Sequence, residues 1–278
     1  MERVFATDFA HMASHLMGKA SRLQLPSPIL RQVINAYAVA TGVSMEEVEQ
    51  PRGGFKNFSE FFGRRLRPGA RVVSEERDSV VSPCDGRIVA FGSIDANESP
   101  AFSIKGSRYN LDALLGTEGS GSSYRQGGYA IIYLHPRDYH RVHVPVEAEL
   151  TVVRHVSGAR YPVNPLFEER VDDIYGKNER MVFHFHLSSG ADFALVMVSA
   201  FGVGNIQTPY ATLPADGGVG RVETELDKPV LLGRGDDLGA FLLGSTVVMV
   251  WPENSFLLDE HLLIGPIAMG RRIGRTIS

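Results

Sequence analysis

The sequence predicts an α+β fold, in which N-terminal amphipathic helices pack on a β-rich body of the sandwich or barrel-like type. Apolar residues recur at helical spacing in the first 70 residues, whereas short β-rich runs punctuated by Gly and Pro follow Val72. The 278 residues are 44% hydrophobic and 22% charged, a composition typical of a globular chain with ample material for a core. We therefore expect a helical region, 1–71, and a β-rich domain, 72–278.

Three helices are expected in region 1–71. The first follows Asp8, and the second ends near Gly42. Asn57 can cap the third helix, with Glu60 at its third position, and Pro68-Gly69 is expected to stop it. The apolar stripes of the three helices are Phe9, Met12, Leu16 and Met17; Leu30, Val33, Ile34 and Tyr37; and Phe58, Phe61, Phe62 and Leu66.

Nine strands are expected in the β-rich domain. They cover residues 79–82, 86–91, 129–134, 141–144, 150–156, 181–187, 193–199, 230–232 and 245–251. Segment 116–128 is rich in Gly and Ser and lacks the ending of a phosphate-binding loop, so we interpret it as a flexible surface connection or lid.

Basic residues concentrate near the end of region 1–71. This region has ten Lys and Arg against six Asp and Glu, a net charge of +4, so a total of −4 leaves −8 for residues 72–278. A local basic strip on an acidic protein argues against nucleic-acid binding and is compatible with an anionic membrane surface. A solvated helix face is the simpler alternative. The strip consists of Arg52, Lys56, Arg64, Arg65, Arg67 and Arg71.

The chain is expected to be soluble or peripheral to a membrane. No apolar run approaches the roughly 18 to 20 residues of a membrane span. The start has no secretory signal pattern, and the early Glu2 and Asp8 do not suit a transit peptide. The single cysteine, Cys84, cannot form an internal disulfide and fits a reducing compartment, where a small buried hydrophobe is its simplest role.

Three segments carry residues that could perform chemistry. Segment 82–87 holds Asp85 at a turn, 138–143 holds His140 and His143, and 242–248 places Ser245 after Gly244. Together they supply an acid, a base and a hydroxyl, the composition of a catalytic triad. Ser245 does not lie in the Gly-x-Ser-x-Gly turn of hydrolases, whereas a preceding glycine suits attack by the serine on its own peptide bond.

Other interpretations of these residues remain open. An ordinary serine hydrolase could use the same triad. The two histidines of segment 138–143 could bind a metal, but no acidic or cysteine partner lies at a recognisable spacing. His184 and His186 form a single His-x-His, which is more often structural than metal-binding. We therefore predict no metal site.

Several motifs together resemble the phosphatidylserine decarboxylases, a pyruvoyl-dependent, self-processing enzyme family. The family's Leu-Gly-Ser-Thr stands at 243–246, its Asp-Tyr-His-Arg-x-His at 138–143 and its Pro-x-Asp-Gly at 83–86. A Phe-Phe-x-Arg-x-Leu-x-Pro-Gly-x-Arg segment at 61–71 and Asn-Glu-Arg at 178–180 are also family-like. The resemblance spans nearly the whole chain.

The resemblance implies a self-cleaving precursor. Ser245 would attack the Gly244 carbonyl, His143 would take its proton, and Asp85 would orient His143. The products would be a β chain, 1–244, and an α chain, 245–278, whose first residue becomes a covalent pyruvoyl cofactor. This group would serve as the electron sink when phosphatidylserine loses carbon dioxide to give phosphatidylethanolamine. His140 would be the proton donor of that reaction.

The family resemblance also implies a place in the cell and leaves alternatives for the substrate. We expect a peripheral protein at the cytoplasmic face of the cytoplasmic membrane, with a homo-oligomer left open. Segments 198–200 (Val-Ser-Ala), 145–148 and 161–164 depart from the family pattern, which commonly has glycine at position 199. A related decarboxylase of soluble amino acids, or a non-catalytic lipid-binding protein, are the alternatives.

Overall fold

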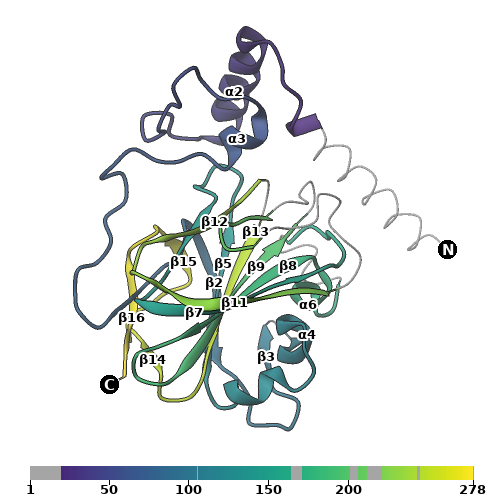
Figure 1. Cartoon of the computed structure of the whole chain (residues 1–278), viewed down its shortest axis with the longest axis vertical. Helices are drawn as coiled ribbons and strands as arrows, with labels where there is room; N and C mark the ends of the chain where they lie inside the picture. Colours follow the sequence, from purple (N-terminus) through teal and green to yellow (C-terminus); the bar gives the residue numbers. More distant parts are fainter. Residues whose placement is uncertain are drawn as a thin grey trace, which may run out of the picture.

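The computed structural model describes residues 20–104, 106–163, 171–200, 206–211, 221–242 and 245–277 (Figure 1). The helix expected after Asp8 lies outside these residues, as does Gly244. The described part confirms the α+β prediction, because a small helical layer sits on a body made mostly of antiparallel strands.

The helical layer is formed by α2 (Ser27–Thr41) and α3 (Phe58–Phe62). Gly42 ends α2 in the left-handed conformation, as the sequence predicts. The Asn57 side chain accepts a hydrogen bond from the Glu60 amide at 2.9 Å, which confirms the predicted cap of α3. The prediction that this helix continues to Pro68 is wrong: α3 ends at Gly63, which packs against Leu242 of the body.

An eight-stranded antiparallel sheet is the main element of the body. Its central strand, β13, pairs with β9 on one side and β5 on the other. In spatial order the strands are β11 (Arg221–Leu232), β7 (Ala148–Val156), β8 (Arg180–His186), β9 (Asp192–Ser199), β13 (Ser245–Trp251), β5 (Gly128–Leu134), β2 (Gly86–Ser93) and β15 (Gly265–Ile267).

Three smaller sheets surround the main one. The first two lie on one face of it, because Val142 and Ile273 share one hydrophobic core with the main sheet, and the third lies on the other face, where Tyr109 belongs to a second core. Their strands are β10 (Ile206–Gln207), β12 (Asp237–Phe241) and β6 (Arg141–His143); β1 (Ser79–Val81), β16 (Arg272–Thr276) and β14 (Phe256–Leu258); and β3 (Ala101–Ile104) with β4 (Ser107–Asn110).

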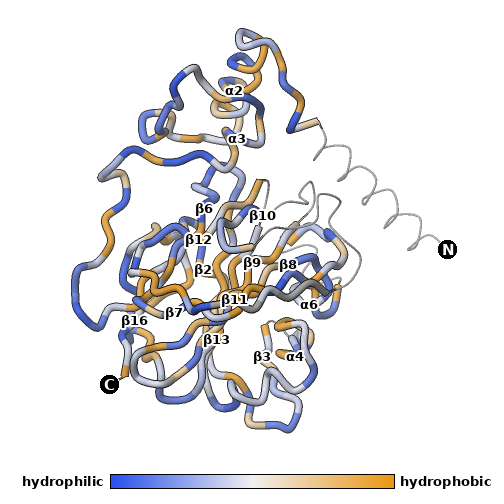
Figure 2. Tube along the Cα trace, in the orientation of Figure 1, coloured by the Kyte–Doolittle hydropathy of each residue, from blue (hydrophilic) through white to orange (hydrophobic). Residues whose placement is uncertain are grey.

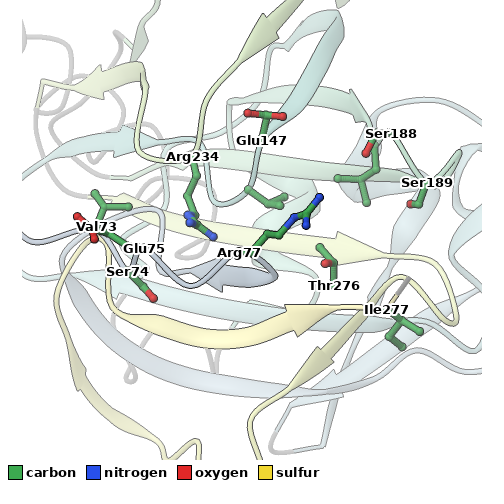
Figure 3. Close-up of a pocket in the computed structure, with 12 residues that line it drawn as sticks. Val73, Ser74, Glu75, Arg77, Glu147, Ser188, Ser189, Arg234, Thr276 and Ile277 are labelled. Atoms are coloured by element: carbon green, nitrogen blue, oxygen red, sulfur yellow. The ribbon is translucent and has the colours of Figure 1, made fainter.

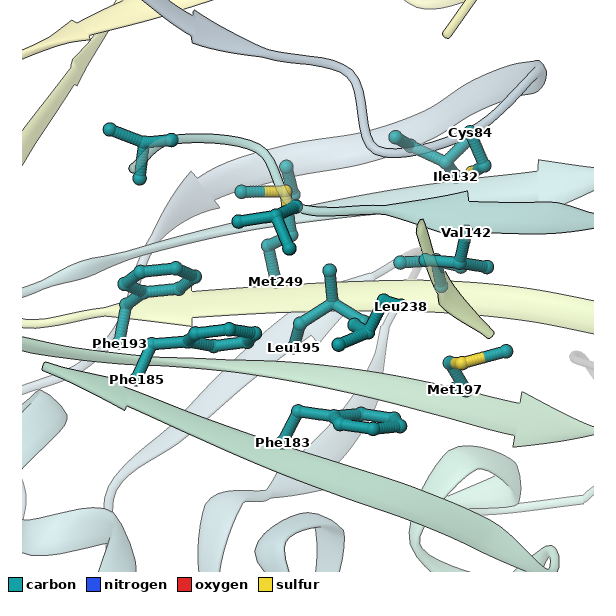
Figure 4. Packing of buried hydrophobic residues seen from close by; sticks show 14 of the residues in the cluster. Cys84, Ile132, Val142, Phe183, Phe185, Phe193, Leu195, Met197, Leu238 and Met249 are labelled. Atoms are coloured by element: carbon teal, nitrogen blue, oxygen red, sulfur yellow. The ribbon is translucent and has the colours of Figure 1, made fainter. Parts of the chain in front are cut away.

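Alternate residues of the main sheet face two different cores, because side chains alternate along a strand. We call the first the inter-sheet core, because the main sheet there packs against β6 and β12. Figures 2 and 4 show the apolar centre of the body. The second, the helix-side core, is covered by α4 (Leu111–Leu115), η1 (Ser120–Tyr124) and α6 (Ile174–Lys177). The inter-sheet core includes Leu134, Val142, Leu195, Met197, Leu238, Phe241, Val247 and Met249, and the helix-side core includes Tyr109, Leu114, Tyr175, Val196, Val198, Val248 and Val250.

All nine predicted strands are present, and the structure adds several short ones that the sequence did not indicate, β3, β4, β10, β12, β14, β15 and β16. Segment 116–128 is not a loose lid. It contains η1, whose Tyr124 is buried, and the Asp112 carboxylate accepts hydrogen bonds from the amides of Gly119 and Gly121 at 2.9 and 2.7 Å.

The predicted basic strip is not a single surface. Arg64 is buried and Arg71 half-buried, and both contact the body. Arg65 is exposed and pairs with Asp237 at 3.1 Å. Arg52, Lys56 and Arg67 are the other exposed members.

Candidate active site

Ser245 is the first residue of the central strand and faces the inter-sheet core. It lies opposite Leu134 on β5 and opposite Ser199 on β9. Val247 and Met249 belong to the inter-sheet core, so residue 245, at the same alternation, points to the same face. The Ser245 side chain is buried, and its hydroxyl has no hydrogen-bond partner among the described residues.

The two candidate histidines belong to the layer on that same side of the sheet. His143 ends β6, and His140 comes directly before this strand. The Phe241 amide donates a hydrogen bond to the His140 carbonyl at 2.9 Å, and Phe241 lies four residues before Ser245 in the chain. The fold therefore brings segments 138–143 and 242–248 together on one side of the main sheet, although about a hundred residues separate them.

His143 is held as a neutral ring. Its Nδ1 donates to the Gly235 carbonyl at 2.8 Å, because a carbonyl can only accept, and its Nε2 accepts from the Tyr139 hydroxyl at 3.0 Å. Burial lowers the pKa of His143, while burial raises the pKa of Tyr139 to about 12, so the phenol keeps its proton. The Nε2 lone pair is therefore unprotonated, as a general base requires.

His140 is also neutral and completely buried. Its Nδ1 donates to the Asp138 carbonyl at 2.8 Å, and its ring packs on Phe62 of α3 with 4.1 Å between ring centroids. Burial lowers its pKa to about 3. The Nε2 atom is buried without a hydrogen-bond partner in the described part of the chain, so His140 presents an unused basic atom.

Asp85 lies at the turn between β1 and β2, where the following glycine is sterically required. A Cβ on Gly86 would lie 2.4 Å from the Tyr133 carbonyl oxygen, which confirms the Asp-Gly turn and brings Asp85 next to the end of β5. The carboxylate accepts hydrogen bonds from Arg71, whose Nε lies 2.8 and 3.0 Å from its two oxygens and whose Nη2 lies 2.5 Å from Oδ2. It also accepts one from the Met269 amide at 2.8 Å.

The expected hydrogen bond between Asp85 and His143 is not formed. Both residues are described, and each is bonded to other groups: Asp85 to Arg71 and Met269, and His143 to Tyr139 and Gly235. Asp85 lies close enough for its charge to raise the pKa of His143, against the larger effect of burial. Its influence on the base is thus electrostatic.

Segment 61–71 connects the helical layer to these residues. Arg71 bridges Asp85 and Glu47 of the layer, at 3.1 Å to the Glu47 Oε1, and the Asp85 bond is the main reason that the pKa of Arg71 is raised. Arg64 donates to the carbonyls of Arg137 and Asp138, at 3.0 and 2.9 Å. Two cations of the segment therefore hold the Asp85 turn and the loop before His140.

The Asn-Glu-Arg segment fixes the end of β9, a role that the sequence did not indicate. Asn178 Nδ2 donates to the carbonyls of Ser199 and Tyr161, at 2.9 and 2.8 Å. The Ser199 amide donates to the Glu179 carbonyl at 2.8 Å. Arg180 donates to the carbonyls of Ala113, Leu114 and Asn178. Three consecutive polar residues at the start of a buried strand were the available signal in the sequence, but they did not indicate which backbone groups they bind.

The side chain of Glu179 lies in a buried ion cluster. Its two oxygens accept from His155 Nε2 at 2.9 Å and from Arg160 Nε at 2.8 Å. Burial raises the pKa of Glu179, but His155 and Arg160 outweigh it, so the pKa is lowered and the carboxylate stays charged.

The remaining candidates are a core cysteine and two histidines with ordinary partners. Cys84 is free and fully buried in the inter-sheet core, as predicted, and burial raises its thiol pKa well above the usual value. The ring of His184 accepts from Arg154, and His186 pairs with the exposed Asp192. No group of three or more His, Cys, Asp or Glu in the described residues could hold a metal.

A groove of about 1170 Å³ lies apart from the candidate residues (Figure 3). Arg77, Arg234 and Glu147 surround it, and none of Asp85, His140, His143 or Ser245 lines it. A smaller cavity of about 370 Å³ is lined by Asp85 and Asp138. Among the helices of the described residues, none is both long and apolar enough to cross a bilayer.

Comparison with known proteins identifies the family. The phosphatidylserine decarboxylase family model matches residues 58–275. The chain is 35% identical to the phosphatidylserine decarboxylase proenzyme of Acinetobacter baumannii over 273 residues, 96% of this chain and 93% of that protein. It is also 35% identical to the proenzymes of Bordetella avium, covering 95% and 90%, and of Brevibacillus brevis, covering 87% and 85%. The chain therefore belongs to the phosphatidylserine decarboxylase family.

Proposed function

We propose that this protein is made as a precursor, cuts itself between Gly244 and Ser245, and then decarboxylates phosphatidylserine to phosphatidylethanolamine. The observation that carries the proposal is the Ser245 hydroxyl, buried and without a described partner at the head of the central strand, in a chain 35% identical to decarboxylase proenzymes. A buried hydroxyl without partners costs free energy, so its retention points to a reactive role.

The self-cleavage begins with attack by Ser245 Oγ on the carbonyl carbon of Gly244. The C–N bond breaks, an ester forms, and the serine nitrogen becomes a free amine. Loss of the Cα proton then breaks the Cβ–O bond, which releases chain 1–244 as a carboxylate. The dehydroalanine left on chain 245–278 takes up water and loses ammonia, which leaves a pyruvoyl group.

His143 is the proposed base for the first step. Its Nε2 lone pair is kept unprotonated by the Nδ1 bond to Gly235 and by the Tyr139 hydroxyl. The hydrogen bond from the Tyr139 hydroxyl to this lone pair must break before His143 can accept the Ser245 proton. The negative charge of Asp85 stabilises the imidazolium that forms on His143.

The residues around position 245 fit a pyruvoyl group. The position is buried, and the hydroxyl of Ser199, directly opposite, has no described partner and can donate to a carbonyl oxygen. When present, the group supplies a carbonyl that condenses with an amine and withdraws electrons as carbon dioxide leaves. Ser245 is its source, so no separate cofactor is needed.

His140 is the proposed acid–base residue of the decarboxylation. A buried imidazole with a pKa of about 3 is a neutral base at rest. It can therefore take a proton from the ammonium group of the substrate and return it to the carbon that has lost carbon dioxide. The family resemblance implies a proton donor; because the pKa of His140 is low, the ring would first have to take up the proton that it donates.

We propose residues 1–71 as a membrane-associating region and 72–278 as the catalytic domain. The helical layer exposes apolar side chains beside cations such as Arg22 and Arg31, a combination suited to an anionic bilayer surface. This would place a peripheral protein on the cytoplasmic face of the cytoplasmic membrane, with phosphatidylserine as the lipid partner. The exposed apolar residues are Leu23, Leu25, Ile29, Val33 and Val39.

The deciding measurement is the intact mass of the purified protein, combined with carbonyl titration. We expect two chains, 1–244 and 245–278, the shorter one carrying one reactive carbonyl, and a Ser245→Ala variant that stays a single chain of 278 residues. A wild-type preparation that remains uncut and carbonyl-free contradicts the proposal, as does cleavage of Ser245→Ala at the same bond.

The substrate is tested separately, with phosphatidylserine in mixed micelles against free serine. We expect release of carbon dioxide from the lipid at least a hundredfold faster at equal concentration. Equal turnover of free serine would instead identify a decarboxylase of soluble amino acids. An uncut chain that binds anionic vesicles would identify a lipid-binding protein.

A further inference from the structure

Ser199 is a second buried hydroxyl at the candidate site. It is the last residue of β9 and lies opposite Ser245 in the antiparallel β9–β13 pair. Its side chain is 1% exposed, and its Oγ has no hydrogen-bond partner among the described residues. Two such hydroxyls on paired strands are therefore unsatisfied at neighbouring positions.

Strand alternation places both hydroxyls on the same face. Leu195 and Met197 on β9, like Val247 and Met249 on β13, belong to the inter-sheet core. Ser199, at the same alternation as Leu195 and Met197, therefore faces the layer that carries His140 and His143. Directly opposite residues of an antiparallel pair have Cβ atoms about 4.5–5.5 Å apart, so a rotamer change brings the two oxygens within hydrogen-bond distance.

The backbone of Ser199 is fixed on both sides. Its carbonyl accepts from Asn178 Nδ2 at 2.9 Å and its amide donates to the Glu179 carbonyl at 2.8 Å. Asn178 is fully buried and also donates to the Tyr161 carbonyl. The position is thus held by a rigid polar network, while the hydroxyl itself is left free for residue 245.

We infer that Ser199 is a positioning residue for self-cleavage: its hydroxyl donates a hydrogen bond to Ser245 Oγ and so holds the nucleophile in one rotamer, while the Ser245 proton remains available to the base. A side chain held in one rotamer keeps the Ser245 oxygen directed toward the carbonyl that it attacks. It also reduces the conformational entropy that is lost on reaching the transition state. Ser199 takes no part in bond exchange, and the Ser245 proton still passes to the base. This inference rests on the proposed function, because it concerns the same cleavage.

The experiment follows the precursor during cell-free synthesis, with a pulse of label and a mass-resolved count of uncut and cut chain. We expect Ser199→Ala and Ser199→Gly to slow the cleavage about tenfold, since each removes one hydrogen bond from the attacking hydroxyl. Ser199→Thr keeps a hydroxyl and is expected to cleave within about threefold of wild type. Thermal unfolding of each uncut chain shows whether it is folded.

Ser255→Ala is the matched control. Ser255 is equally buried, lies beyond the other end of β13 and donates to the Pro252 carbonyl at 3.0 Å, away from the candidate site. We expect it to lose thermal stability but to cleave at the wild-type rate. Slowing of Ser255→Ala to the same degree as Ser199→Ala would show a general packing effect and overturn the inference.

Step-specific trapping makes the test independent of folding. Hydroxylamine cleaves the ester that forms after the attack, so it accelerates chain cleavage only where the later elimination is slow. Because Ser199 acts on the attack, hydroxylamine is expected to leave Ser199→Ala and Ser199→Gly slow. Restoration of their rate by hydroxylamine, a wild-type rate without it, or equal rates for the Thr and Ala variants each overturn the inference. A wild-type chain that never cuts overturns the proposed function instead.

Discussion

Two buried polar groups flank the end of β9 and differ in how they are satisfied. In the group around Asn178 and Arg180, the side-chain donors reach backbone carbonyls of three separate segments. In the group around Ser245, the oxygens of Ser245 and Ser199 and the Nε2 of His140 have no described partner. Burial is nearly complete in both, so burial alone does not distinguish them.

We propose that this difference separates residues that hold the fold from residues that take part in the reaction. A buried hydroxyl or imidazole without a partner costs about 1–3 kcal/mol, and a stable fold tolerates few of them. Other unpartnered atoms occur in the described residues, such as His155 Nδ1 and Asp173 Oδ1, but we propose that those of Ser245, Ser199 and His140, which lie around the start of β13, are retained for reactivity. Substitutions in the group around Ser245 should therefore change cleavage or turnover, whereas substitutions in the group around Asn178 and Arg180 should change the free energy of unfolding.

The largest effect is expected from His140→Asn. An asparagine amide can still donate to the Asp138 carbonyl but lacks the basic Nε2 atom. We expect cleavage between residues 244 and 245 to continue, while phosphatidylserine turnover falls about 10²- to 10⁴-fold, the usual contribution of a general acid–base group. Intact mass and release of carbon dioxide measure the two events separately.

His186→Asn is the control for this variant, because His186 is exposed and pairs with the exposed Asp192 at the surface. It should retain both cleavage and turnover. Loss of cleavage in a folded His140→Asn chain, or turnover within tenfold of wild type, would contradict the role given to His140.

Arg180→Met should show the opposite pattern. Arg180 is 3% exposed, and removal of its guanidinium leaves the carbonyls of Leu114, Asn178 and the half-buried Ala113 without their donor. We expect the free energy of unfolding of the uncut Ser245→Ala background to fall by about 3 kcal/mol, measured by urea titration. The folded fraction of the otherwise wild-type chain should cleave within about threefold of the normal rate.

Arg275→Met supplies the comparison for Arg180→Met, since Arg275 is exposed on β16. Its free energy of unfolding should change by less than about 0.5 kcal/mol. An Arg180→Met chain that is folded and as stable as the parent, yet remains uncut, would show that Arg180 acts in the cleavage. The distinction between the group around Ser245 and the group around Asn178 and Arg180 would then be wrong.

The sequence was sufficient where a local pattern decides the structure. Helical spacing and Gly42 predicted α2, and alternation and turn residues predicted the long strands of the main sheet. The cap at Asn57 could be predicted because the capping hydrogen bond comes from Glu60, three residues further along the chain. Ser245 stood out through its motif and its neighbour Gly244.

Contacts between distant segments could not be predicted in this way. Arg64 and Arg71 looked like members of a charged surface, because nothing local shows that the Asp138 carbonyl and the Asp85 carboxylate meet them. The Asp85–His143 pairing was implied by the family resemblance, but Arg71 binds that carboxylate. Short strands such as β15 depend on pairing with β2, so their three residues carry too little pattern of their own.

The smallest predicted effect concerns pH and the buried ring of His140. Its pKa is about 3 in the folded chain and about 6.5 when unfolded, so the unfolded chain binds more protons between these values. Stability from this group is therefore complete above pH 6.5 and is lost as the pH falls toward 3.

In an uncut Ser245→Ala background, the chain with His140 should lose about 1 kcal/mol between pH 6.5 and 5.5 relative to the same chain with His140→Asn. Urea titrations of the two chains at matched ionic strength measure this difference, and the contributions of other titrating groups, His143 included, cancel. Parallel stability curves would mean that the ring is not buried as a neutral base, and would remove His140 from the group of unsatisfied reactive residues.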